Sequence, residues 1–480
     1  MDYADFLRDV LQAPSVTGRE QRTFGILNPA NGETIAQVPD LDEQDTIQAI
    51  EKADKAFRQW SRRTAKDRAG ILMRWYRLIM DHQEELAQII TAECGKPLPE
   101  SRGEVAYGAS FIEWFAEEGK RLYGDMVPAQ GPDKRIMVLK QPIGVISAIT
   151  PWNFPNAMIT RKVAPALAAG CTAIVKPAEA TPLSALAMEK LARDAGIPEG
   201  VLQIVTTARP ADVGKVLTTH PTVRKFTFTG STAVGKLLAA QCAGTVKKVS
   251  LELGGNAPFI VFDDADMDAA IQGAMASKYR NAGQTCVCAN RFYVQDGVYD
   301  EFVKRLTEAV SGLKVGDGAE EGITVGPLIN RAAVDKVEGL VQASLATGGT
   351  ATIGGSRHGF GENYFEPTVL ANLEHGADIS RAEIFGPVAP VFRFRDEEEV
   401  IRMANDTPYG LAAYFYARDL GRVFRVAEAL EYGIVGINEG IISTEVAPFG
   451  GIKESGIGRE GSRYGIDDYV EIKYCLIGGL

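Results

Sequence analysis

Two cysteines, Cys286 and Cys288, lie one residue apart in the stretch NAGQTCVCANR, residues 281–291. Such a pair could be half of a metal site, a disulfide, a redox switch, or a nucleophile with an incidental neighbour. None of the four histidines lies within fifty residues of the pair, and no second closely spaced cysteine pair completes a zinc set. We therefore expect no metal here, and the other three roles stay open.

A second chemical feature is the glycine-rich stretch FTGSTAVGKLL, residues 228–238. It is close to the loop of nucleoside triphosphatases, but Leu237 stands where that loop needs a serine or threonine to hold magnesium. A glycine turn that opens a helix still offers free N–H groups to a phosphate. Gly230, Ser231 and Gly235 are therefore predicted to bind the phosphates of a dinucleotide. A phosphate-loop NTPase is the alternative from a different class of enzyme.

The elements that position these residues follow from the apolar periodicity. Residues 43–123 carry apolar side chains at helical spacing, and residues 134–142 alternate as a strand does. From residue 143, apolar strands alternate with helices, one of which ends at Gly170, and a second alternating series starts at residue 257. This pattern predicts an α/β protein with a doubly wound parallel sheet, in which ligands bind at the carboxyl ends of the strands.

Length and composition limit the classes of function. A chain of 480 residues is long enough for two or three domains. A net charge of −11 without a basic block disfavours nucleic acid and anionic membranes as partners. The acidic N-terminus is unlike a signal peptide, and the six scattered cysteines do not form a disulfide framework. We expect a cytoplasmic protein with free thiols.

Seven motifs, taken in order, resemble the aldehyde dehydrogenase superfamily over nearly the whole chain. They are PWNFP (151–155), KPAE (176–179), FTGST (228–232), LELGGN (251–256), GQTC (283–286), EIFGP (383–387) and PFGGIKESGIGRE (448–460).

The resemblance implies a Rossmann-type NAD-binding domain, a second α/β catalytic domain and a small β oligomerisation segment. The implied bounds are 1–123 and 143–253 for the first, 254–460 for the second, and 124–142 and 461–480 for the third. It also implies a homodimer or homotetramer.

The resemblance assigns roles that suit aldehyde oxidation. Cys286 matches the nucleophile, whose thiohemiacetal expels hydride to leave a thioester. Asn153 matches the side-chain donor to the oxyanion, together with the backbone N–H of Cys286. Glu252, an acidic residue that ends an apolar strand, matches the base that activates water to hydrolyse the thioester. Glu460 matches a carboxylate of a proton relay.

The cofactor residues implied by the resemblance are Trp152, Lys176, Glu383 and Phe385, with Glu179 facing the adenine ribose. A carboxylate at that place accepts hydrogen bonds from a 2′-hydroxyl and repels a 2′-phosphate. We therefore predict that NAD is preferred, with NADP possible but disfavoured.

The stretches at residues 156–171, 278–291 and 439–451 resemble the succinate-semialdehyde dehydrogenase subfamily most. By this resemblance Arg161, Arg280 and Ser443 bind the far carboxylate of the substrate, because paired guanidiniums grip a planar anion. The implied reaction is the NAD-dependent oxidation of succinate semialdehyde to succinate. Glutarate semialdehyde and sulfonated or phosphonated aldehydes are alternatives for such an anionic substrate.

The nucleophile role for Cys286 leaves Cys288 with two interpretations. It is either a small packing residue or, as in some relatives with the same pair, a redox regulator that reversibly inactivates the enzyme by forming a disulfide with Cys286.

Overall fold

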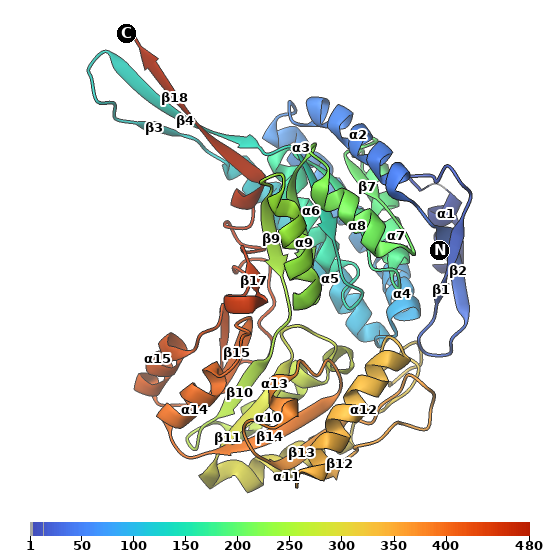
Figure 1. Ribbon diagram of the computed structural model, residues 1–480, viewed down its shortest axis with the longest axis vertical. Coiled ribbons are helices and arrows are strands. Elements are labelled where there is room, and N and C mark those ends of the chain that lie inside the picture. The colour runs from blue at the N-terminus through green and yellow to red at the C-terminus, as the bar shows by residue number, and fades with distance from the viewer. Residues whose placement is uncertain (1–2, 13) are drawn as a thin grey trace.

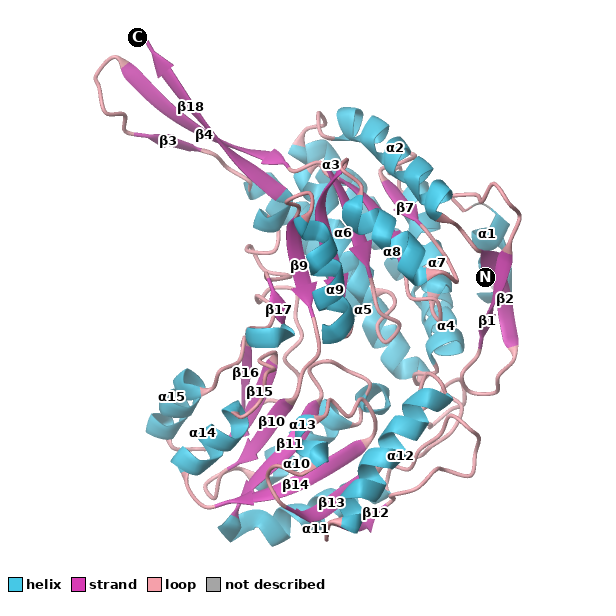
Figure 2. Cartoon of the chain, viewed as in Figure 1, coloured by secondary structure: helices cyan, strands magenta, loops and turns pink. Residues whose placement is uncertain are grey.

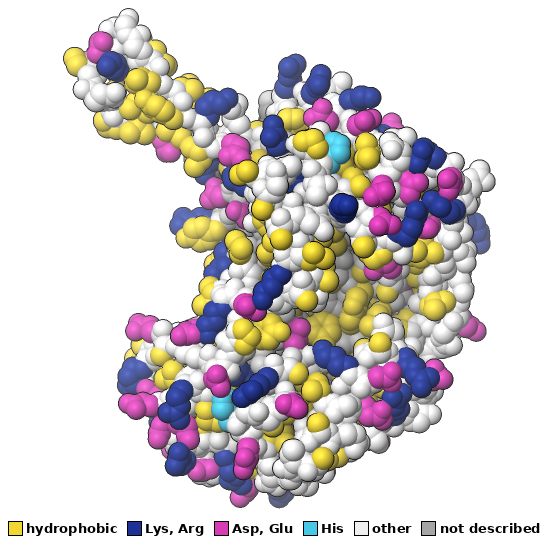
Figure 3. Space-filling model, in the orientation of Figure 1, with side chains coloured by type: hydrophobic (Ala, Val, Ile, Leu, Met, Phe, Trp, Pro, Cys, Tyr) yellow, Lys and Arg dark blue, Asp and Glu magenta, His cyan; other side chains and the backbone are white. Residues whose placement is uncertain are grey.

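The computed structural model describes residues 3–12 and 14–480, which form two lobes and a projecting arm (Figure 1). Each lobe is built around its own sheet, and helices cover both (Figure 2). The surface is hollowed between the lobes, and hydrophobic side chains gather in this hollow (Figure 3). No helix in the described part of the chain is long and apolar enough to span a membrane.

The first lobe holds a six-stranded sheet in the order β17-β9-β8-β5-β6-β7. Its strands are parallel except for β17, and every residue of β5 and β6 is buried, as expected of a strand covered on both faces. The bounds are β5 (Val145–Ile149), β6 (Thr172–Lys176), β7 (Leu202–Ile204), β8 (Val223–Thr229), β9 (Lys248–Glu252) and β17 (Gly456–Ile457). The predicted doubly wound parallel sheet is confirmed.

Helices surround this sheet where the sequence predicts them. The helical region predicted at 43–123 contains four helices, and the predicted end at Gly170 is a left-handed cap with φ of 107°. The helices are α1 (Tyr3–Gln12), α2 (Glu43–Trp60), α3 (Ala65–Asp81), α4 (Gln83–Cys94), α5 (Leu98–Glu118), α6 (Ala157–Ala169), α7 (Pro182–Asp194), α8 (Pro210–Thr219) and α9 (Thr232–Ala243). A hairpin of β1 (Thr23–Leu27) and β2 (Thr34–Pro39) lies beside α1 and α4 (Figure 1).

The second lobe holds a seven-stranded sheet in the order β12-β13-β14-β11-β10-β15-β16, parallel except for β12. The strands are β10 (Ala257–Val261), β11 (Ala289–Gln295), β12 (Thr350–Ile353), β13 (Thr368–Leu373), β14 (Val388–Phe394), β15 (Ala412–Tyr416) and β16 (Ile434–Ile437). The helices are α10 (Met267–Lys278), α11 (Tyr299–Ser311), α12 (Arg331–Ala346), α13 (Asp378–Arg381), α14 (Glu397–Asn405) and α15 (Leu420–Ala429).

The arm is a three-stranded antiparallel sheet made by β3 (Asp125–Val127), β4 (Lys134–Pro142) and β18 (Val470–Gly478). The segments 124–142 and 461–480 of the sequence thus meet in one sheet. Apolar side chains of β18 face solvent: Ile472 is 70% exposed and Tyr474 58%.

The chain crosses back to the first lobe before it enters the arm. After β16, it forms β17, in which Gly456 pairs with Glu252 at the edge of the first sheet. Residues 456–457, inside the segment 254–460 predicted as catalytic domain, therefore complete the sheet of the other lobe. The functional division at those bounds stays a prediction.

Candidate active site

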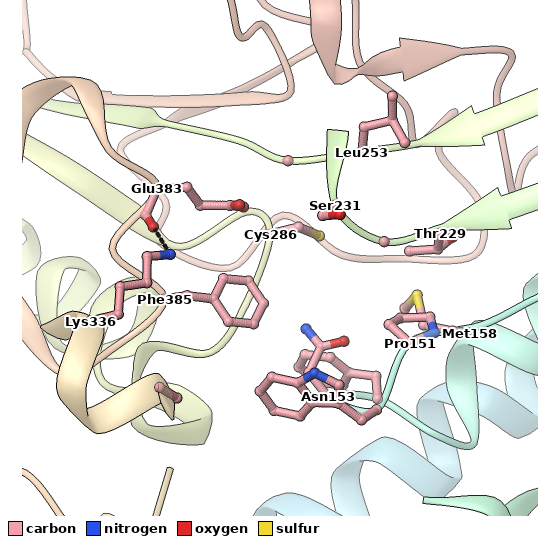
Figure 4. Close-up of a pocket in the computed structure, with 15 residues that line it drawn as sticks. Pro151, Asn153, Met158, Thr229, Ser231, Leu253, Cys286, Lys336, Glu383 and Phe385 are labelled. Carbon is pink, nitrogen blue, oxygen red and sulfur yellow. Dashed lines mark hydrogen bonds between the residues drawn. The ribbon is translucent and has the colours of Figure 1, made fainter. Parts of the chain in front are cut away.

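Two cavities meet at Cys286, at the carboxyl edge of the first sheet. The first cavity, of about 280 Å³, is lined by Trp152, Ser231, Glu383, Phe385 and Cys286, among others (Figure 4). The second cavity, of about 290 Å³, is lined by Cys286 together with Tyr107, Arg161, Arg280 and Ser443, among others. Because the parallel strands β5, β8 and β9 all end at this edge, residues that follow them come together opposite the loop of Cys286.

The loop that presents Cys286 begins with three successive residues in the left-handed region. Asn281, Ala282 and Gly283 have φ of 51°, 54° and 76°. A Cβ at Gly283 would lie 2.1 Å from the carbonyl oxygen of Gly386, so only glycine fits this place. Strained backbone of this kind is often found at functional sites, where the surrounding structure fixes a side chain.

Asn153 is held rigidly beside Cys286 in the first cavity (Figure 4). Its Nδ2 donates to the carbonyl oxygen of Gln284 at 2.9 Å, and its own backbone oxygen accepts from Lys96 Nζ at 2.9 Å. An amide nitrogen carries two protons, so one donor of Asn153 is left for an oxyanion.

The thiol of Cys286 is protonated at neutral pH. Burial raises its pKa to about 12, against the opposing effect of the Arg161 charge, and Glu252 and Glu383 raise it further. A nucleophilic reaction at this sulfur therefore needs a group that takes the proton as the bond forms.

Glu252 has the properties of a proton acceptor for a later step, in which water attacks. It ends β9, is 4% exposed, and its Oε2 has no hydrogen-bond partner among the described residues. Burial raises the pKa of this carboxyl well above its usual range, and the charge of Glu460 raises it further. A carboxyl with a raised pKa is a stronger base, when ionised, than an ordinary carboxylate.

Glu460 is buried as well, but it stays ionised. Lys162 Nζ lies 2.5 Å from its Oε1, and Arg161 Nε lies 2.9 Å from its Oε2. Burial alone would raise the pKa of Glu460, but these two cations outweigh burial and lower it. The site thus contains two buried carboxyls whose pKa values are shifted in opposite directions.

The glycine turn differs in part from its prediction. The N–H of Gly230 donates to the oxygen of Glu252, and the N–H of Gly235 donates to the oxygen of Ser231 within α9. The prediction that both glycines offer free N–H groups is therefore wrong. Gly235 instead allows close packing, because a Cβ there would lie 2.3 Å from Leu253 Cδ2.

Groups for a phosphate remain at this turn. Ser231 caps α9, and the first N–H groups of a helix have no acceptor inside it. Thr229 lines the first cavity, and its Oγ1 is buried with no hydrogen-bond partner in the described part of the chain. These groups could hold a dinucleotide.

The other predicted cofactor residues lie at two separate positions in the structure. Glu383 and Phe385 line the first cavity with Trp152, whose ring meets that of Phe385 edge-on at 5.7 Å. Lys176 and Glu179 are not part of that lining; they lie at the end of β6, where Lys176 Nζ pairs with Glu179 Oε1 at 2.5 Å.

Cys288 does not line either cavity. It is buried, and its thiol donates to the backbone oxygen of Lys278 at 3.5 Å. Both Cys286 and Cys288 are free thiols in this structure.

Comparisons with known proteins decide the family. Residues 16–475 match the sequence model of the aldehyde dehydrogenase family. The chain belongs to the aldehyde dehydrogenase family.

Three curated relatives of this aldehyde dehydrogenase are similar over nearly its whole length. It is 61% identical to a glutarate-semialdehyde dehydrogenase of Pseudomonas aeruginosa, over 96% of this chain and 95% of that protein. It is also 61% identical to the NADP(+) succinate-semialdehyde dehydrogenase of Escherichia coli, over 94% of each. A 3-sulfolactaldehyde dehydrogenase of Pseudomonas putida is 58% identical over 97% of this chain and 96% of that protein.

A solved structure has the same fold. The crystal structure of succinate-semialdehyde dehydrogenase from Burkholderia pseudomallei has a TM-score of 0.95 to this aldehyde dehydrogenase at 60% identity, and the match covers 96% of each chain. The predicted family and fold are therefore confirmed, and the protein oxidises aldehydes with NAD(P).

The NTPase alternative is wrong. Lys236, its expected phosphate ligand, pairs with Glu454 at 2.8 Å, and Leu237 is 59% exposed on α9.

Several residues that line or support the site were not predicted from the sequence. Lys162 follows Arg161 in a helix, and its sequence context gives no separate signal. Lys336 lies on a helix whose sequence is typical of a surface, but its Nζ donates to the backbone oxygen of Glu383 at 2.6 Å (Figure 4). Glu100 accepts from the N–H of Asn281 at 2.8 Å. Only the fold brings these residues to the site.

Proposed function

We propose that this aldehyde dehydrogenase oxidises succinate semialdehyde to succinate. The observation that carries the proposal is the second cavity, in which Arg161, Arg280 and Ser443 share a lining with Cys286. An aldehyde carbon at the sulfur of Cys286 would place the other end of a short substrate among cationic and hydroxyl donors. Guanidiniums bind a carboxylate through paired hydrogen bonds, so this cavity suits an anionic aldehyde.

Other anionic aldehydes are close competitors. One relative is named a glutarate-semialdehyde dehydrogenase, and another is named a 3-sulfolactaldehyde dehydrogenase. Glutarate semialdehyde is one methylene longer, and a pocket discriminates one methylene by only about 1–3 kcal/mol. A phosphonated aldehyde also suits the two arginines. A kcat/KM panel over these aldehydes ranks them.

The chemical steps are divided among three residues in this proposal. The sulfur of Cys286 bonds to the aldehyde carbon as the thiol proton passes to solvent, and the carbonyl oxygen becomes an oxyanion to which Asn153 Nδ2 donates. A bound nicotinamide would supply the hydride acceptor, and Trp152, Glu383 and Phe385 line the cavity that would hold it. Glu252 then takes a proton from water as the oxygen of that water bonds to the thioester carbon, and the same proton passes to the Cys286 sulfur as the carbon–sulfur bond breaks and the acid is released. The proposed role of Glu460 is to support this step, because its negative charge helps to keep the pKa of Glu252 raised.

The preferred cofactor in this proposal is NAD. The carboxylate of Glu179 is 40% exposed at the end of β6, where Lys176 holds it. A 2′-phosphate there would meet a negative charge, whereas a 2′-hydroxyl would find an acceptor. One relative carries NADP(+) in its name, so the comparison of kcat/KM with both cofactors is informative. A higher kcat/KM with NADP would refute the preference.

We expect Arg280→Ala to lower kcat/KM for succinate semialdehyde by about 10- to 100-fold, because a hydrogen bond to a charged group contributes about 1.5–3 kcal/mol. The same variant should change kcat/KM for butanal little, because butanal has no acid group. Steady-state kinetics with both aldehydes measure this difference. Equal losses on both substrates would contradict the proposed role of Arg280.

We expect Cys288→Ala to retain full dehydrogenase activity and to lose the reversible part of inactivation by dilute peroxide. In the parent enzyme, oxidation of Cys286 followed by attack of Cys288 would form a disulfide that a thiol reductant reopens. The measurement is activity after peroxide and again after dithiothreitol. If the variant recovers as the parent does, Cys288 is a packing residue.

The arm is proposed as the oligomerisation segment. Its strand β18 is an edge strand with exposed apolar side chains, including Ile472 and Tyr474, and such edges associate unless they are covered. A dimer or a dimer of dimers is expected. A molar mass of one chain by light scattering would refute it.

A further inference from the structure

The second cavity contains a buried hydroxyl that makes no hydrogen bond of ordinary geometry to the residues that the structure describes. Tyr107, on α5, lines this cavity, and its ring meets Phe111 edge-on at 5.1 Å. Its hydroxyl is buried and makes no hydrogen bond of ordinary geometry within the described residues. Buried hydroxyls are normally paired, so an unpaired one in a cavity indicates a place where a ligand supplies the partner.

The neighbours of Tyr107 define the chemistry of that ligand. Tyr107 shares the lining of the second cavity with Arg161, Arg280 and Ser443, and its hydroxyl faces that of Ser443. Guanidinium groups can donate hydrogen bonds but cannot accept them, so neither arginine can take the proton of the tyrosine. Among these three neighbours, only the hydroxyl of Ser443 can accept.

Arg161 shows the same deficit. Its Nε lies 2.9 Å from Glu460 Oε2 as an ion pair, but neither Nε nor the buried Nη2 has a hydrogen-bond partner in the part of the chain that the structure describes. Burial also raises the pKa of the Tyr107 hydroxyl, which therefore keeps its proton at neutral pH and is a donor. The cavity thus presents two buried donors that make no ordinary hydrogen bond among the described residues, and an anionic oxygen satisfies both.

We propose that the Tyr107 hydroxyl donates to the far acid group of the substrate and is a specificity-determining residue of this enzyme. The inference rests on the proposed function, because it needs an acid group between Arg161 and Arg280. It adds a neutral donor from α5 to the two arginines and the serine, so four segments of the chain surround one acid group. A carboxylate has about four acceptor positions on its two oxygens and can receive all of these donors.

Tyr107→Phe tests the proposal, because it removes the hydroxyl and keeps the ring that packs on Phe111. We expect kcat/KM for succinate semialdehyde to fall by about 10- to 100-fold, mainly through KM, since the bond forms in the ground state and the transition state alike. For butanal, kcat/KM should stay within about twofold of the parent. The inhibition constant of succinate, measured against butanal as substrate, should rise by the same factor and reports binding without turnover.

Two further variants make the outcome unambiguous. Tyr464→Phe removes the hydroxyl of an exposed tyrosine outside both cavities. It should leave kcat/KM unchanged for both aldehydes. Arg280→Ala, measured beside it, tests the acid-group site itself. Selective loss in Arg280→Ala with no change in Tyr107→Phe would overturn the tyrosine inference and leave the proposed function standing. Equal losses on both aldehydes in Tyr107→Phe would make the tyrosine a packing residue, which also overturns the inference. Non-selective loss in Arg280→Ala would overturn the proposed function first.

Discussion

Cys286→Ala is expected to lower kcat for aldehyde oxidation on the order of 10⁴-fold or more, because removal of a covalent nucleophile leaves only binding and oxyanion stabilisation. Alanine fits the site, since the Cys286 side chain is only half-buried and lines both cavities. The fold should therefore survive, and the variant should still bind the substrate. The measurements are the absorbance of the reduced cofactor at steady state and the melting temperature.

Cys288→Ala is the matched control for this variant, because it removes a thiol two residues away in the same loop. It should retain activity, whereas Cys286→Ala should not. The raised pKa of Cys286 also predicts that a neutral alkylating agent reacts with it slowly at pH 7 and faster as the pH rises. Retention of a tenth or more of the parent kcat in Cys286→Ala would refute the nucleophile role.

Glu252→Gln is expected to release about one equivalent of reduced cofactor per subunit in a burst and then to turn over about 10²–10⁴-fold more slowly than the parent. Glutamine has nearly the same size as glutamate but cannot accept the proton of water, so the thioester on Cys286 should accumulate. Because burial keeps the pKa of Glu252 raised, the neutral amide should be tolerated in the fold. Stopped-flow absorbance measures the burst, and intact mass after an acid quench detects the acyl group.

The pH dependence of the parent enzyme follows from the same carboxyl. Glu252 accepts a proton only when ionised, so thioester hydrolysis should be lost as the pH falls through its raised pKa. This acidic limb should lie above the range of an ordinary carboxyl and should be absent from the slow phase of Glu252→Gln. Glu471→Gln, an exposed residue of the arm, is the control and should keep the parent profile. If Glu252→Gln shows no burst because it is slowed before the cofactor is reduced, Glu252 acts in the attack of Cys286 on the aldehyde and not in thioester hydrolysis.

The sequence was sufficient for the elements of the first lobe and for the family. Alternating apolar strands and helices are a local pattern, so the helix end at Gly170 in the first lobe appears where it was predicted, as does the strand at 134–142 in the arm. The motifs around Asn153, Glu252 and Cys286 are also local, and they lie at strand ends and loops that the fold brings to one edge.

Hydrogen bonds between distant segments were not predictable in the same way. The sequence of the glycine turn predicts free N–H groups, but the N–H of Gly230 donates to the backbone oxygen of Glu252, on another strand. The pairing of Glu460 with Lys162 joins residues 298 positions apart, and no periodicity reports such a contact.

The amino-acid sequence by itself determined the α/β class, the order of the strands along the chain and the candidate nucleophile Cys286, because each depends on neighbouring residues. Only the tertiary structure decided the electrostatics of the site. Glu252 and Glu460 are both glutamates at motif positions, yet burial raises the pKa of one while two buried cations lower that of the other. The Tyr107 hydroxyl, which makes no ordinary hydrogen bond among the described residues, is likewise a property of the packed cavity, because only the fold buries it there.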